Sequence, residues 1–187
     1  MQAQTAVVSA PSLTGRRVLA VLLGVAVVAI AAQVAIPVPG TPVPMTLQPL
    51  AVLIVGGLLG PRLGARSLLL YVALGATGLP VFTPFGPPGV GRLLGATGGY
   101  LLAYPIAAYA VGRLVGDGRR WSRVALAVFV GLALIHLGGL AQLLIITHSL
   151  HAAARLGTWP FLLGDLAKLI IAGAILRPTV SPLRARL

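Results

Sequence analysis

Long apolar runs alternate with short polar or Pro/Gly-rich segments along most of the chain. Six runs stand out, at about 18–36, 46–59, 65–79, 97–115, 124–147 and 159–176. A helix needs roughly 20 apolar residues to cross the hydrocarbon core of a bilayer. The pattern therefore predicts an all-α integral membrane protein, a six-transmembrane-helix bundle whose second and third spans are short. The first run exceeds the apolar region of a typical signal peptide, so we expect it to be retained.

The segments between these runs predict loops, since they hold many helix-breaking residues. Segment 37–44 contains four prolines in eight residues, a density that no helix tolerates. Segment 80–95 is also rich in proline and glycine, and we expect further loops at 116–123 and 148–158. The whole chain, 1–187, then forms a single membrane domain: a helical bundle over about 18–176, with flexible tails at 1–15 and 178–187.

Composition supports a membrane location. Hydrophobic residues make up 58% of the chain and charged residues 9%, with a mean hydropathy of +1.01. A soluble domain usually has about a quarter charged residues, so this chain has too few to cover a water-facing surface. It contains no cysteine, which excludes disulfides and thiolate chemistry.

The charge is strongly one-sided, with 14 Lys and Arg against 2 Asp and Glu. In a soluble protein this excess would suggest nucleic acid as a partner. In a membrane protein cations gather in cytoplasmic segments, so no nucleic-acid partner is expected. With both termini cytoplasmic, 11 of the 14 cations lie on the inner side: Arg16, Arg17, Arg62, Arg66, Arg113, Arg119, Arg120, Arg123, Arg177, Arg184 and Arg186. The Pro/Gly-rich loops at 37–44 and 80–95 then lie on the outer face.

Two opposite charges lie within the last apolar run. Asp165 and Lys168 are three residues apart, so they share one face of a helix. Charges inside a membrane span are costly and usually face a protein interior or a water-filled cavity. The pair is either a structural ion pair or, as we favour, one that also meets a polar ligand through adjacent donors and acceptors.

Arg92 is the cation of the second outer loop. One interpretation is a solvated loop arginine; the other is a clamp for an anionic group such as a carboxylate. The surrounding prolines and glycines make this loop a candidate lid.

Further polar or small residues flank the predicted spans. Gly98 permits either tight helix packing or a pocket wall, and Tyr100 is either a ligand contact or an ordinary interface residue. Thr46 is a candidate helix cap, whereas Gln48 is better explained as pocket lining. Small residues recur four apart in the first span, at Ala20 and Gly24 and again at Ala31 and Ala35, which suits internal packing or a partner helix.

Catalytic and metal sites are not expected. The two acidic residues are far apart in sequence, no phosphate-binding Gly-x-x-x-x-Gly-Lys loop occurs, and nothing places a serine beside a histidine and an aspartate. His148 and His151 have a spacing that metal ligands can have, but no carboxylate is near them in sequence. We therefore expect a protein that is not an enzyme and needs no cofactor.

Four motifs together resemble the BioY family, the biotin-specific S components of energy-coupling factor (ECF) transporters. They are Pro37-Val-Pro-Gly-Thr-Pro-Val-Pro-Met-Thr-Leu-Gln48, Gly78-Leu-Pro-Val-Phe82, Gly98-Gly-Tyr-Leu101 and Gly164-Asp-Leu-Ala-Lys168. The resemblance extends over roughly 18–176. The chain departs from the family's usual Gly-Pro-Thr-Gly-Gly-Tyr by having alanine at position 96, and residue matching within 82–92 is loose.

The resemblance implies a multi-pass protein of the bacterial plasma membrane that binds biotin beneath its outer loops. It implies that Asp165 and Lys168 engage the ureido ring, that Arg92 meets the carboxylate, and that apolar and aromatic residues such as Phe82 cover the remaining ring. It also implies two kinds of partner, a transmembrane coupling protein, facing the small residues of the first span, and two ATPase subunits. The alternatives are an S component for another small heterocyclic vitamin and a structural membrane protein without a ligand.

Overall fold

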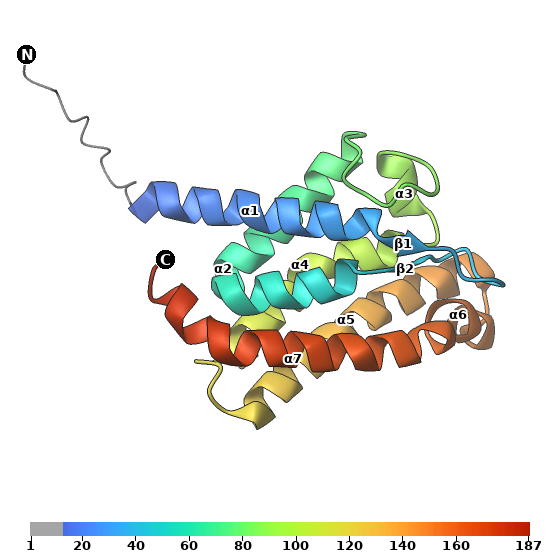
Figure 1. Ribbon diagram of the computed structural model, residues 1–187. Coiled ribbons are helices and arrows are strands. Elements are labelled where there is room, and N and C mark those ends of the chain that lie inside the picture. Colours follow the sequence, from blue (N-terminus) through green and yellow to red (C-terminus); the bar gives the residue numbers. More distant parts are fainter. Residues whose placement is uncertain (1–12) are drawn as a thin grey trace, which may run out of the picture.

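The computed structural model describes residues 13–187 and is mostly helical (Figure 1). The helices are α1 (Leu13–Gln33), α2 (Gln48–Ala76), α3 (Val90–Leu94), α4 (Gly98–Leu114), α5 (Trp121–Thr147), α6 (Leu150–Gly157) and α7 (Leu162–Arg184), with a 3-10 turn, η1 (Trp159–Phe161), before α7. Two short strands, β1 (Ala35–Ile36) and β2 (Met45–Thr46), pair antiparallel.

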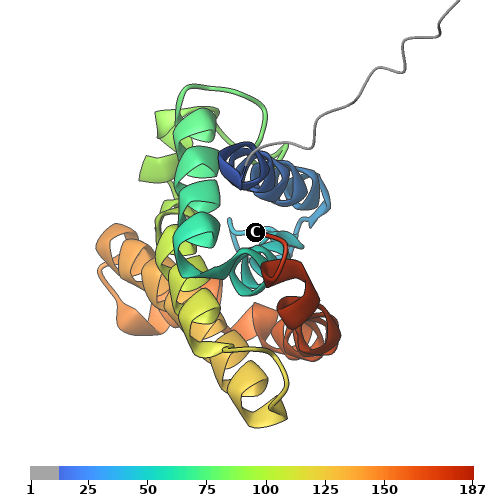
Figure 2. The same ribbon diagram turned by 90° about the vertical axis from the view of Figure 1, so that its left-hand side faces the viewer.

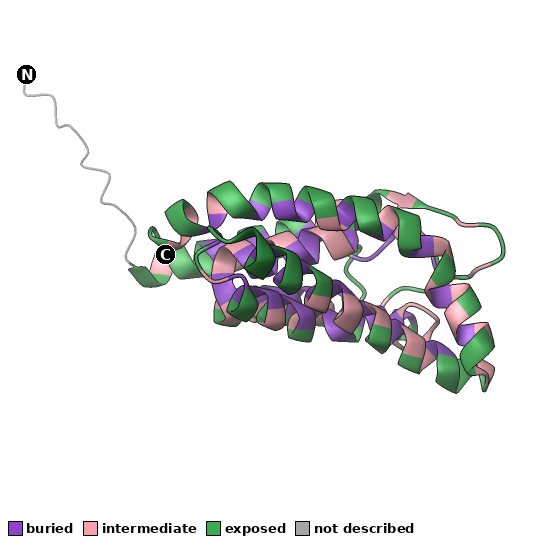
Figure 3. Cartoon of the chain, turned by 90° about the horizontal axis from the view of Figure 1, so that it is seen from below, coloured by how far each residue is buried: buried purple, intermediate pink, exposed green. Residues whose placement is uncertain are grey.

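Several helices match the dimensions of a bilayer. Within 13–187, four are long and apolar enough to cross a membrane: α1, α2, α5 and the continuous segment Leu150–Arg184. Their outward faces carry large apolar side chains, such as Ile30 at 69% and Leu163 at 86% exposure, while the buried residues face the bundle interior (Figure 3). This distribution suits lipid rather than water as the surrounding solvent.

Helix α2 is bent sharply at Gly60, where the sequence predicts the end of one span. Gly60 has φ 81° and ψ 176°, which is not helical, and Pro61 follows it. The two halves of α2 form a V whose apex lies at the same end of the bundle as the start of α1 and the end of α7 (Figure 1). The break between 46–59 and 65–79 is therefore confirmed, although no loop separates the two halves.

Arg184 stabilises this corner. Because Pro61 has no N–H, the carbonyl of Gly57 lacks its helical donor. The Arg184 guanidinium donates to that carbonyl at 2.6 Å, to the carbonyl of Gly112 at 3.0 Å and to that of Gly116 at 3.0 Å. The corner of α2, the end of α4 and the end of α7 are thereby joined, and they lie together when the bundle is viewed from this end (Figure 2).

Glycines let the central helices approach closely. A Cβ at Gly56 of α2 would lie 2.6 Å from the carbonyl oxygen of Ala108 in α4, and one at Gly99 of α4 would lie 2.0 Å from that of Gly138 in α5. Both distances are below van der Waals contact, so only glycine fits. These contacts fix α4 between α2 and α5.

The connections contain more structure than the sequence predicts. Segment 37–44 is the turn of the β1–β2 hairpin, 80–95 includes α3, and 148–158 is mostly α6. Helix α7 continues to Arg184, so most of the tail expected at 178–187 is helical, and residues 13–15 belong to α1. The rest of the expected N-terminal tail, residues 1–12, lies outside the described residues.

The small residues of α1 pack inside the chain, which is one of the two roles expected of them; contact with a partner helix stays a prediction. Ala20 and Gly24 are buried, and a Cβ on Gly24 would lie 2.6 Å from Ser67 Oγ of α2. Ala31 is half-buried and packs against the core, while Ala35 is half-buried in β1. The close approach of α1 to α2 uses these positions, leaving the bulky apolar side chains on the outer face of α1.

Candidate functional site

A cavity lies where the β1–β2 hairpin and the loop after α2 meet α4, α5 and α7. Its lining comes from every one of these elements: Val43, Pro44, Thr46, Gln48, Pro49, Phe82, Thr83, Arg92, Thr97, Tyr100, Leu101, Tyr104, Ile135, His136, Phe161, Asp165 and Lys168. The lining thus includes seven of the eight residues that the sequence analysis names as candidate ligand contacts, among them both members of the charged pair; the eighth is Gly98.

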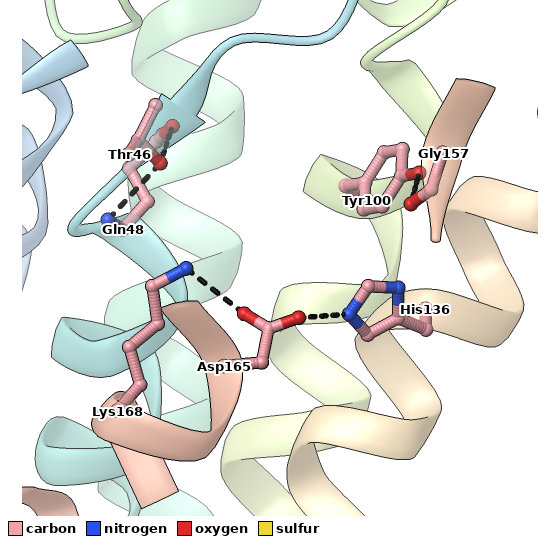
Figure 4. A network of polar contacts seen from close by, with 7 residues as sticks. All are labelled: Thr46, Gln48, Tyr100, His136, Gly157, Asp165 and Lys168. Carbon is pink, nitrogen blue, oxygen red and sulfur yellow. Dashed lines mark hydrogen bonds and ion pairs between the residues drawn. The ribbon is translucent and has the colours of Figure 1, made fainter. Parts of the chain in front are cut away.

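Asp165 is the centre of a three-residue polar network (Figure 4). Lys168 Nζ donates to Asp165 Oδ1 at 2.9 Å, and His136 Nε2 lies 2.6 Å from Asp165 Oδ2. Asp165 and Lys168 are 4% and 6% exposed. Each carboxylate oxygen therefore has a partner in the low-dielectric interior, which offsets the cost of burying the charge.

His136 is the residue that sequence reasoning missed. It comes from α5, 29 positions before Asp165, and nothing in the sequence aligns the two helices. The available signal was a lone ionisable residue in the middle of an apolar helix, which marks a candidate site by itself. Because the carboxylate accepts, Nε2 carries the proton; the other ring nitrogen, Nδ1, is buried and has no partner among the described residues.

Gln48 and Thr46 form a second polar group at the start of α2. Thr46 lies in β2, one residue before the N-cap position, and its hydroxyl accepts from the Gln48 backbone N–H at 3.2 Å. The Gln48 amide donates to Tyr71 Oη at 2.6 Å, and Tyr71 donates in turn to the Val81 carbonyl at 2.9 Å. This chain of bonds ties the cavity wall to the loop after α2.

Arg92 is buried rather than solvated, being 6% exposed. Its guanidinium donates to the Thr83 hydroxyl at 2.8 Å, the Thr83 carbonyl at 2.9 Å, the Pro87 carbonyl at 3.0 Å and the Phe85 carbonyl. Burial lowers the pKa of Arg92 from its ordinary value, yet arginine stays charged in proteins. Four of its five donors hold the loop, which leaves one for another group.

Tyr100 connects the cavity to α6. Its hydroxyl donates to the Gly157 carbonyl at 2.6 Å, and its ring lies edge-on to His136 with centroids 6.2 Å apart. Phe82 packs edge-on against Tyr71. Gly98 is outside the lining, and a Cβ there would lie 1.8 Å from the Leu93 carbonyl, so its contribution is close packing.

The arrangement is suited to binding a small polar molecule. Acceptors on Asp165, donors on Lys168 and an amide on Gln48 face a space that is also lined by aromatic and aliphatic groups, as in many ligand pockets, and by threonine, arginine and histidine side chains. Within 13–187, no group of three or more His, Cys, Asp or Glu side chains could hold a metal ion.

Comparisons with known proteins agree with this architecture. The BioY family model matches residues 3–185. A probable biotin transporter BioY of Pyrococcus horikoshii is 40% identical over 79% of this chain and 86% of its own, and a biotin transporter BioY of Thermotoga maritima is 35% identical over 80% and 87%. The crystal structure of an S-component for biotin from an ECF-type ABC transporter superposes with a TM-score of 0.79 at 26% identity, covering 90% of this chain and 94% of that one.

The fold and the buried polar cavity define a helical membrane protein of the S-component type. This chain belongs to the BioY family.

Proposed function

We propose that this chain is the biotin-binding S component of an ECF-type uptake transporter. The observation that carries the proposal is the Lys168–Asp165–His136 network, buried in the wall of a cavity and built from two helices. Its membership of the BioY family and its likeness to a biotin S-component support the same ligand. The protein is a transport component and not an enzyme.

The cavity chemistry matches the two ends of biotin. The ureido ring donates through two N–H groups and accepts through its carbonyl, so it complements Asp165 and the free donors of Lys168. Arg92 retains one N–H for the carboxylate, and Phe82 and Tyr100 supply apolar surface for the sulfur-containing ring. Thr46 and Gln48 complete the polar side of the wall.

The proposed topology has six spans with both termini in the cytoplasm. The two halves of α2 count as two spans, and the 17 residues of α4 extend about 26 Å, close to the thickness of a bilayer core. Arg17 Nε donates to the Leu187 carbonyl at 3.1 Å, which supports placing both ends on one side. The chain then lies in the plasma membrane of a bacterial cell, with its cavity toward the outer face.

The proposed partners are a transmembrane coupling protein and two ATPase subunits. The chain's own sequence has no phosphate-binding loop, so energy for inward delivery of biotin comes from these partners. Of the small residues proposed to face the coupling protein, Ala20 and Gly24 are buried. Ala31 and Ala35 are only half-buried and stay the proposed contacts. No observation favours another vitamin or a ligand-free structural role.

Equilibrium binding tests the proposal through Asp165. Replacing Asp165→Asn removes the charge that holds Lys168 and His136, so biotin affinity should fall at least tenfold, about 1.4 kcal/mol. Isothermal titration calorimetry in detergent measures the biotin affinity of each variant. Asp117→Asn is the matched control, since Asp117 is the other carboxylate and lies on an exposed turn. Millimolar affinity in the wild type, or equal losses in both variants, would contradict the proposal.

A further inference from the structure

A second depression lies on the outside of the bundle, where the corner of α2 meets α4. It is lined by Leu59, Pro61, Arg62, Leu63, Tyr109 and Arg113, and it shares no residue with the biotin cavity. Its two arginines lie at the cation-rich end of the bundle, on the same side as the corner at Gly60. The depression therefore combines two positive charges with an apolar wall.

The two arginines have no counter-ion among residues 13–187. Neither Arg62 nor Arg113 makes a side-chain hydrogen bond or an ion pair with any residue of 13–187. The whole sequence has 2 acidic residues, and both are engaged elsewhere. Asp165 binds Lys168 and His136, and Asp117 lies beside Arg119. The pair is therefore free to bind an anion from outside the chain.

Along the exposed face of α4, apolar side chains are followed by a tyrosine and then an arginine, in the same order as the acyl chain, interface and headgroup of a lipid. Leu102, Ile106 and Tyr109 are 51%, 62% and 49% exposed, and Arg113 is also exposed, so one stripe runs from aliphatic through tyrosine to cation. Leu102 and Arg113 are eleven positions apart, or about 16 Å along the helix. One leaflet of a bilayer core is about 15 Å thick. The stripe thus extends over the depth of an acyl chain and ends at the headgroup level.

We propose that the depression binds the phosphate headgroup of an anionic phospholipid in the cytoplasmic leaflet. Arg62 and Arg113 contact the phosphate from α2 and α4, and Tyr109 lies at the boundary between headgroup and chain, where tyrosine is enriched. One acyl chain lies along Leu102 and Ile106. Because the site joins the corner of α2 to α4, bound lipid stabilises the contact between these helices.

Native mass spectrometry of the full chain, released from nanodiscs of phosphatidylcholine and phosphatidylglycerol in equal amounts, tests the proposal. We expect the wild type to retain phosphatidylglycerol at least fivefold over phosphatidylcholine. The double variant Arg62→Gln/Arg113→Gln should lose this preference. Arg120→Gln/Arg123→Gln removes the same charge from exposed residues at the same end and should keep it. Size-exclusion profiles in pure phosphatidylcholine establish that each variant folds.

Four outcomes would overturn the proposal. The first is equal retention of the two lipids by the wild type. The second is an equal loss of preference in both double variants, which would mean that general positive charge attracts the lipid. The third is that inorganic phosphate raises the thermal midpoint of the wild type as much as phosphatidylglycerol does, through the same two arginines; the ligand would then be a free anion. A loss of coupling-protein binding in Arg62→Gln/Arg113→Gln, with lipid preference unchanged, would also reject the lipid as occupant.

Discussion

Asp165 owes its place in the cavity to partners from two helices. Lys168 is one turn away on α7 and was expected from the sequence, whereas His136 approaches from α5. A carboxylate held on both oxygens has a fixed orientation, so its remaining lone pairs keep fixed directions. On the proposed function, His136 is a positioning residue for the ligand.

Replacing His136 tests this positioning. His136→Leu removes the partner of Asp165 Oδ2 and should weaken biotin binding about tenfold, because a hydrogen bond to a charged group contributes about 1.5–3 kcal/mol. His136→Gln keeps a donor and should restore part of the affinity. His151→Leu, on the exposed side of α6, is the control and should bind as the wild type does. Unchanged affinity in His136→Leu, measured by titration calorimetry, would remove the residue from the site.

Individual residues show how far sequence reasoning reaches. The cost of intramembrane charge singled out Asp165 and Lys168, and both line the cavity. The same reasoning left Arg92 as either a solvated loop residue or a clamp for a ligand; the structure rules out the solvated alternative by burying Arg92 among loop carbonyls, while the clamp stays a prediction. The sequence does not reveal the path of the folded loop, and that path decides which backbone carbonyls surround Arg92. It does not reveal how α5 packs against α7 either, and that packing brings His136 to Asp165.

At the scale of elements, the sequence predicted where helices bend or end better than it predicted the structure of the segments that connect them. Proline and glycine placed the corner of α2 correctly, because Pro61 removes a donor and Gly60 adopts positive φ. The β1–β2 hairpin and α6 were missed, since both are stabilised by tertiary bonds such as that from Thr41 Oγ1 to the Leu156 carbonyl at 2.5 Å. Local propensity does not encode such contacts.

The corner of α2 depends on α7 through Arg184. Arg184→Met removes the donors to the carbonyls of Gly57, Gly112 and Gly116, so the free energy of unfolding should fall by about 2 kcal/mol. The thermal midpoint in detergent should drop accordingly. Arg186→Met is the control, since Arg186 is exposed two residues further on, and it should leave the midpoint unchanged. Equal midpoints for the two variants would show that the corner stands without Arg184.

At the scale of the whole molecule, the distribution of charge sets the proposed orientation. The turn between α4 and α5 and the corner of α2 lie at the end rich in arginine, and the hairpin and α6 lie at the other end (Figure 1). Because the chain has no cysteine, a single cysteine introduced by substitution is the one site that a maleimide can label. Leu150→Cys should react with an impermeant maleimide in intact cells, and Ser122→Cys only after permeabilisation. The opposite pattern would invert the topology.

The assignment of biotin is the central claim, and a thermal-shift panel on the purified chain tests it most directly. A ligand present at 100 times its Kd and bound only by the folded state adds about 2.7 kcal/mol of stability. We expect biotin to raise the midpoint, its uncharged amide to raise it less because Arg92 loses the carboxylate, and thiamine and riboflavin to leave it unchanged. A midpoint that biotin does not move, or that thiamine or riboflavin moves as far, would contradict the account.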